Sequence, residues 1–212
     1  ANFLAGVGGL WGVPMWAFYV NRGQALTSFG VANKDGAIEG FVTAEKAYQE
    51  TPFTGFRTFL KAERNGECFT HEPFFPSTGS SIKEMKRNMH IGMNEVEISE
   101  EAPELGLNTN VLYFTIPNED FPALIRQTTF TNTRKGSLKM DVLDGLAKLI
   151  PAGLTNAGEA AMGRTYEAWM KVYNVGNNGE GDFTRPFFHI TQGTADTSTV
   201  QLVKEGHFAV SY

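Results

Sequence analysis

Hydrophobic and polar residues alternate along much of this chain, as they do in β-strands that bury one face. The longest such segment runs from Phe121 to Leu146, with alternating residues at 124–132 and again at 138–143. Between them lies the polar segment 132–137, where Gly136 can adopt the positive φ that tight connections need. This pattern predicts two strands paired as an antiparallel hairpin. The residues expected to share one face of its first strand are Leu124, Arg126, Thr128, Phe130 and Asn132.

The same alternation predicts further strands, separated by segments rich in glycine, asparagine and proline. The clearest turn signal is Asn65-Gly66, which predicts a hairpin between a strand at 56–62 and one at 67–72. The other predicted strands cover residues 15–20, 24–31, 90–98, 111–116, 187–191, 199–203 and 207–212.

One segment has helical spacing instead. In residues 156–173, helix-favouring residues are frequent and large apolar side chains recur on one side, which predicts an amphipathic helix packed against a sheet. We therefore predict a mainly β protein, in which residues 1–212 form a single large antiparallel β-sandwich domain with one amphipathic helix. The apolar positions of this helix are Met162, Tyr166, Trp169, Met170 and Tyr173.

Composition and charge narrow the possible functions. The formal net charge of −5 and the sequence pI near 5.4 argue against a nucleic-acid partner, because phosphate binding needs clustered Lys and Arg. Cys68 is the only cysteine, so the chain can form no internal disulfide and no cysteine zinc site, which favours a reducing, cytoplasmic location. The apolar residues 1–20 are interrupted by glycines and Pro14, so neither a signal peptide nor a membrane helix is expected.

Residues suited to catalysis are few. The four histidines, at positions 71, 90, 189 and 207, show no metal-ligand spacing, and we expect no metal site. Glu95 and Glu97 fall on one face of a predicted strand, where carboxylates usually meet water rather than substrate. We assign no catalytic residue.

Exposed aromatic residues are the remaining candidates for binding, because the apolar faces of sugar rings stack on aromatic side chains. Trp11 and Trp16 bracket Pro14 in a glycine-rich segment, and Tyr48 and Gln49 precede Phe53 in an expected loop. Each of these four residues is a candidate contact for a sugar or for a neighbouring domain. For Trp16, packing in the core is the alternative.

Three segments together resemble a known family. RQTTFTNT (126–133) followed by a short charged turn and LKMDVLDGL (138–146) looks like the N-terminal β-domain of glycoside hydrolase family 94, the cellobiose-phosphorylase-like and β-oligoglucan-phosphorylase-like enzymes. TSFGVANKDGAIEGF (27–41) and TPFTGFRTFLKAERNGE (51–67) add to the likeness, whereas the N-terminal Gly/Trp segment matches no family motif.

This resemblance implies a supersandwich fold of the galactose-mutarotase type and a larger parent enzyme. In the family, an (α/α)6 helical barrel follows the β-domain and supplies the catalytic acid and the phosphate pocket. Inorganic phosphate is the substrate that cleaves β-glucosides such as cellobiose or β-glucan oligosaccharides to a sugar 1-phosphate. The present chain would then be an excised, non-catalytic N-terminal part, which contributes structure, homodimer contacts and the rim of an oligosaccharide site.

Two alternatives stay open. A free-standing mutarotase-like enzyme would need His90 or His189 to converge with a glutamate in a cleft, and a free-standing sugar-binding module would need an exposed aromatic platform. A large apolar face without a cleft would instead favour the phosphorylase domain.

Overall fold

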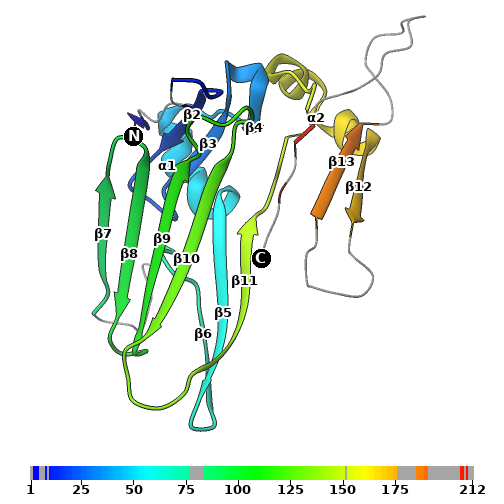
Figure 1. The fold of residues 1–212 in the computed structure, drawn as a ribbon. Coiled ribbons are helices and arrows are strands. Elements are labelled where there is room, and N and C mark those ends of the chain that lie inside the picture. Colours follow the sequence, from blue (N-terminus) through cyan, green and yellow to red (C-terminus); the bar gives the residue numbers. More distant parts are fainter. Residues whose placement is uncertain are drawn as a thin grey trace, which may run out of the picture.

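The structure is a computed structural model, and it describes residues 2–4, 8, 10–76, 84–150, 152–175, 185–190, 206, 207 and 209. In this part of the chain the fold is mainly β, and every strand pairing is antiparallel (Figure 1). The prediction of a mainly β, sandwich-like fold is confirmed.

Within the described residues the strands form four sheets. The first has the order β1 (Asn2–Phe3), β2 (Met15–Tyr19), β3 (Leu26–Val31), β4 (Ala37–Glu39). The second has the order β10 (Leu124–Asn132), β9 (Leu107–Thr115), β8 (Glu95–Ala102), β7 (Lys86–Ile91). The third has the order β11 (Lys139–Leu146), β5 (Phe56–Arg64), β6 (Glu67–His71), and the fourth pairs β12 (Met170–Val175) with β13 (Arg185–Ile190).

The predicted hairpin between residues 124 and 143 is wrong in its pairing, although both of its strands exist. β10 pairs with β9, with Leu124 opposite Thr115 and Asn132 opposite Leu107, and β11 pairs with β5 in the next sheet. The connection 133–138 therefore crosses from one sheet to the other. Alternation identifies a half-buried strand but carries no information about which neighbour it pairs with.

The other strand predictions are confirmed at some positions and wrong at others. The β5–β6 hairpin is confirmed, with Asn65 and Gly66 both at positive φ (53° and 85°). The single strand predicted at 90–98 is wrong, because a turn before Glu95 divides it into β7 and β8. A strand does occupy 185–190, close to the predicted 187–191. The predicted strands at 199–203 and, for most of its length, 207–212 lie outside the described residues.

Helices occur in two places, with a short 3-10 turn η1 (Lys34–Gly36) before them. α2 (Asn156–Trp169) begins where the sequence predicts a helix but ends four residues earlier than the predicted 173, where the chain enters β12. α1 (Ala44–Thr54) was not predicted, and the expected loop around Tyr48 is wrong. Pro52 lies within its last turn, which disguises the helix in the sequence.

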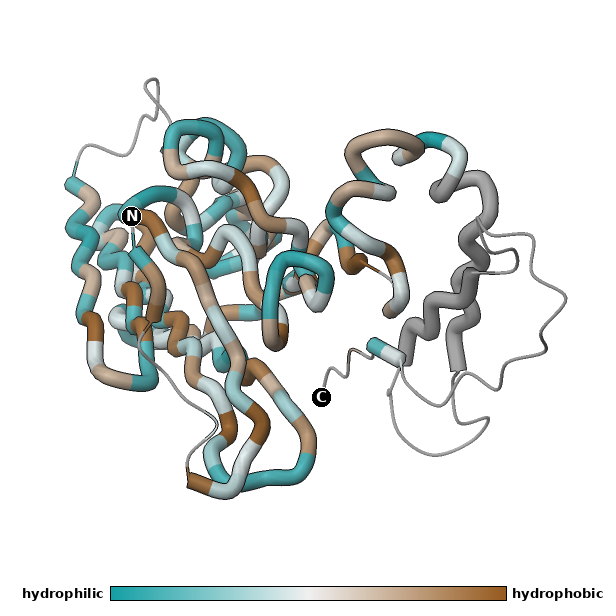
Figure 2. The backbone as a smooth tube through the Cα atoms, turned by 90° about the horizontal axis from the view of Figure 1, so that it is seen from above, coloured by the Kyte–Doolittle hydropathy of each residue, from teal (hydrophilic) through white to brown (hydrophobic). Residues whose placement is uncertain are grey.

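The inner faces of the second and third sheets are turned toward each other, as the contacts between their side chains show. His71 of β6 contacts Glu100 of β8, and Arg64 of β5 donates to the backbone carbonyl of Leu105 in the β8–β9 turn. Alternate residues of β8 and β9 are buried, with Val96, Val111 and Tyr113 fully inaccessible. Hydropathy alternates accordingly along the chain (Figure 2).

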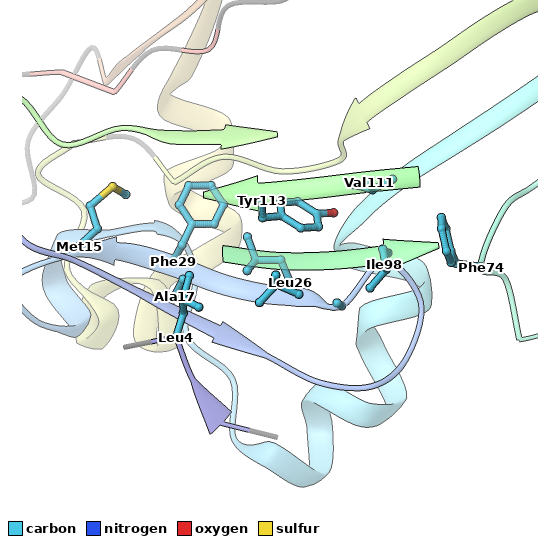
Figure 3. Close-up of a cluster of buried hydrophobic side chains, with 11 residues drawn as sticks. Leu4, Met15, Ala17, Leu26, Phe29, Phe74, Ile98, Val111 and Tyr113 are labelled. Atoms are coloured by element: carbon cyan, nitrogen blue, oxygen red, sulfur yellow. The ribbon is translucent and has the colours of Figure 1, made fainter. Parts of the chain in front are cut away.

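The main hydrophobic core lies at one end of this sandwich, where the first sheet covers it. Figure 3 shows Leu26 and Phe29 of β3 approaching Tyr113 and Val111 of β9. Phe56 of β5 completes the cluster, with its ring 5.5 Å from that of Tyr113 and 6.2 Å from that of Phe29. Within the described residues, neither helix has the length and apolar character needed to cross a membrane.

Candidate functional site

The four candidate binding residues lie in different environments. Trp11 is 82% exposed, and its backbone N–H points to Oδ1 of Asn118 at 3.4 Å. Trp16 is half-buried in β2, and its indole N–H is directed at the backbone carbonyls of Val31 and Asn33, at 3.4 and 3.3 Å. The Trp16 side chain is therefore engaged in local contacts of the first sheet.

Tyr48 and Gln49 lie on α1 rather than in a loop. Tyr48 is half-buried and packs against a small cluster that contains Phe18, whereas Gln49 is exposed. The ring of Phe41 borders the same cluster and contacts Trp16 edge-on at 6.2 Å. Trp16 and Tyr48 thus border one aromatic cluster, but each is engaged in packing, and they form no open platform.

The histidine and glutamate that do meet were not singled out from the sequence. Nε2 of His71 lies 2.7 Å from Oε1 of Glu100, and Arg87 Nε and the Phe74 backbone N–H donate to Oε2, each at 2.7 Å. Burial alone would raise the pKa of Glu100, but the bonds from His71 and Phe74 and the charge of Arg87 outweigh it, so the pKa is lowered. A carboxylate with three hydrogen-bond partners and a lowered pKa stabilises the fold and is a poor general base.

The histidines that the mutarotase-like alternative requires do not form a described catalytic pair. His90 is exposed on β7, opposite Glu97 of β8. Glu97 in turn accepts a hydrogen bond from the Asn110 side chain at 2.5 Å. His189 lies on β13, in the register position opposite Lys171.

A second polar network, around Arg126 of β10, joins strands of the second and third sheets to the turn before β3. Its guanidinium forms an ion pair with Asp144 of β11, and also donates to Oε1 of Gln24, to the Thr58 hydroxyl at 3.1 Å and to the Tyr113 hydroxyl at 3.2 Å. Thr58 itself donates to Asp144 at 2.5 Å. The Arg126 side chain is only 9% exposed.

The electrostatics of this network favour a fixed charge. Burial would lower the pKa of Arg126, but Tyr113 and Asp144 outweigh it, and the pKa is raised. Burial raises the pKa of Tyr113 in spite of the neighbouring guanidinium. Both shifts favour the protonated forms of these groups, so the network is suited to holding sheets together rather than to moving a proton.

The outer face of the third sheet is different, because its apolar side chains are uncovered. Leu143 is 70% exposed and Phe59, its cross-strand neighbour, 38%. In the next row Asp141 stands opposite Lys61. We call the surface formed by these four residues the β11 face.

A shallow groove of about 540 Å³ runs over the β11 face. At its margin the Arg57 guanidinium lies 4.5 Å from the ring centre of Phe59 and pairs with Glu72 at 2.7 Å. Charged side chains on this surface therefore stand next to groups of opposite charge, and the apolar side chains are the groups left for contact with a partner. Such a surface suits docking rather than catalysis.

The sequence predicts β5 and β11 in two separate hairpins. It therefore gives no indication that these two strands pair and share this face. Leu143 and Val142, adjacent apolar residues of which one must point away from the interior, were the available signal. In the described part of the chain, no cluster of three His, Cys, Asp or Glu residues could hold a metal ion. Comparison of the sequence with profiles of known protein families and with curated proteins finds no match.

Proposed function

We propose that this chain is a non-catalytic β-sandwich domain of a glycoside phosphorylase, of the supersandwich type, and that its β11 face packs against the helical catalytic barrel of the same enzyme. The parent enzyme would use inorganic phosphate to cleave β-glucosides such as cellobiose or β-glucan oligosaccharides to a sugar 1-phosphate, as a cytoplasmic homodimer. The resemblance of residues 27–41, 51–67 and 126–146 supplies this family.

The exposed apolar surface of β11 and β5 carries the proposal. Leu143 of β11 is 70% exposed, and Phe59, its cross-strand neighbour on β5, is 38% exposed. Neighbouring large apolar groups that remain open to solvent mark contact surfaces. Each of these groups gains about 25 cal/mol per Å² of apolar area when a partner covers it.

The two alternatives are less well supported by the geometry. A mutarotase-like site needs His90 or His189 to converge with a glutamate in a cleft, whereas His90 is exposed on β7 and the glutamate opposite it, Glu97, accepts a hydrogen bond from Asn110. A sugar-binding module needs an aromatic platform, whereas Trp16 and Tyr48 are engaged in packing, which leaves Trp11 as the exposed aromatic residue among the four candidates.

The activity test compares the 212-residue chain with the full-length product of its gene. Both are incubated with cellobiose or cellodextrins and inorganic phosphate, and release of glucose 1-phosphate is measured. We expect release from the full-length protein and none from the chain. A full-length protein that releases no sugar phosphate from any of these substrates refutes the proposal, and interconversion of sugar anomers by the chain alone favours the mutarotase-like alternative.

The docking surface is tested separately with Leu143→Asp. In the isolated chain this exposed change is expected to alter the free energy of unfolding by no more than about 0.5 kcal/mol. In the full-length protein it places a charge against an apolar partner, so the β-domain should be cleaved from the rest by limited proteolysis more quickly. Thr129→Asp, on the exposed outer face of β10, is the matched control, and equal effects of the two variants would refute the assignment of the β11 face.

A further inference from the structure

A second hollow, of about 330 Å³, lies between β3 and β4 on one side and α1 and the start of α2 on the other. Its floor includes the buried residues Thr27, Glu39 and Thr51, and its mouth includes the exposed residues Lys148 and Asn156. This volume is at the small end of the range for small-molecule sites. We call it the Glu39 cavity.

Glu39 is the unusual group in this cavity. It is only 7% exposed, and its Oε2 atom is buried without any hydrogen-bond partner among the described residues. Its position is fixed by backbone pairing with Phe29 of β3. Burial raises the pKa of Glu39 well above the ordinary value for a glutamate. Buried polar atoms are almost always hydrogen-bonded, so a carboxyl group that lines a hollow and has an oxygen without a partner lacks a donor.

The threonines and the lysine of the lining do not supply that donor. Thr27, Thr51 and Thr54 each donate their only hydroxyl proton to a backbone carbonyl, so their hydroxyl groups can only accept a further hydrogen bond. The ammonium group of Lys148 forms an ion pair with Glu159. Among these four side chains, acceptors are therefore in excess of free donors.

The charge balance points in the same direction. Glu39, Glu50 and Glu159 face one cation, Lys148, around a single hollow. The lining offers little to a sugar ring, because its one aromatic side chain, Phe41, already stacks on Phe3 and lies under the ammonium group of Lys34 at 5.0 Å. No three of the described carboxylates are grouped as metal ligands. An organic cation with several N–H donors fits these conditions best.

We propose that the Glu39 cavity binds a small organic molecule through a primary ammonium group, which pairs with the Glu39 carboxyl group at the floor while Glu50 and Glu159 balance the remaining charge. This site is independent of the β11 face and of the phosphorylase assignment. Binding would convert Glu39 to a carboxylate paired with the ammonium group, and a proton would leave the protein wherever Glu39 was protonated beforehand.

The test uses the 212-residue chain and isothermal titration calorimetry. The probe is 1,4-diaminobutane, and 1,4-butanediol is its neutral counterpart of the same length. We expect the diamine to bind and the diol not to bind. Glu39→Gln keeps the shape of the side chain but removes its charge, and it should weaken diamine binding about thirtyfold or more.

Two further measurements keep the result interpretable. Glu104→Gln, in the exposed β8–β9 turn, is the matched control and should bind the diamine as the unmodified chain does. The folding of Glu39→Gln is checked by thermal unfolding. Equal affinity of the unmodified chain and Glu39→Gln, equal binding of diol and diamine, or no diamine binding at millimolar concentration would each overturn the proposal.

Discussion

Replacing Arg126 with methionine tests whether the buried network holds the two large sheets together. Methionine fills a similar volume but provides no donor, so Asp144, Gln24 and Tyr113 each lose a hydrogen-bond partner. Removing one member of a buried ion pair usually costs 3 to 5 kcal/mol, roughly, because the other charge stays behind. Since the Asp144 side chain is 25% exposed and can regain water, we expect the lower value, about 3 kcal/mol.

A loss of this size is readily measured. The free energy of unfolding is obtained from urea titrations followed by tryptophan fluorescence, and the same loss should lower the unfolding temperature by about 6 to 12 °C in a chain of this size. Lys148→Met is the matched control, because Lys148 is 58% exposed and its ion pair with Glu159 should contribute less than about 1 kcal/mol. If Arg126→Met costs no more than Lys148→Met, the reasoning about the buried network is wrong.

Three further predictions concern single positions. The pKa of Glu100 is lowered in the folded state, so the stability that its carboxylate contributes is complete above its unfolded pKa, near 4.3, and is lost as the pH falls through the folded value. Glu100→Gln should reduce this loss of stability in acid, which is measured as the urea midpoint at a series of pH values. Gly66→Ala should cost about 1 kcal/mol in the same titration, because φ is +85° and no atom lies within 4 Å of the added methyl group, so backbone strain alone acts. Trp16→Ala should lower the free energy of unfolding by about 2 to 3 kcal/mol. Trp11→Ala, at an 82% exposed position, should change it by less than about 0.5 kcal/mol. Similar losses from both substitutions would contradict the different burial of these residues.

The sequence reveals the strands of this fold better than their partners. Alternation located β10 and β11 to within a residue or two at most ends, and it correctly grouped Arg126 with Thr128 on one face, because side-chain direction is a local property of a strand. It could not show that β11 pairs with β5, a strand more than seventy residues earlier. The Asn65-Gly66 turn did identify a partner, since a two-residue connection leaves its flanking strands only one way to pair.

The candidate sites were harder to predict for a related reason. Glu39 reads as an ordinary polar residue in its sequence, and only the packing of β4 against α1 and α2 shows that its carboxyl group is buried and without a partner. The helix α1 could have been suspected from Thr43 followed by Ala44-Glu45-Lys46-Ala47, a cap-compatible residue before good helix formers. Pro52 and weak amphipathicity concealed it.

The polar contacts inside the sandwich and the β11 face outside it involve the same two strands, β5 and β11. Arg64 reaches from β5 to the β8–β9 turn, and Arg126 reaches from β10 to Asp144 of β11, so each links one sheet to the other. Apolar contacts resist separation of two sheets but permit sliding, whereas hydrogen bonds of defined direction also fix their relative position. Leu143, on the β11 face, immediately precedes Asp144 and points to the opposite side of the same strand. The ion pair between Arg126 and Asp144 therefore joins the two sheets at the residue next to Leu143, so it fixes the relative position of β10 and β11 in a way that an apolar pair would not.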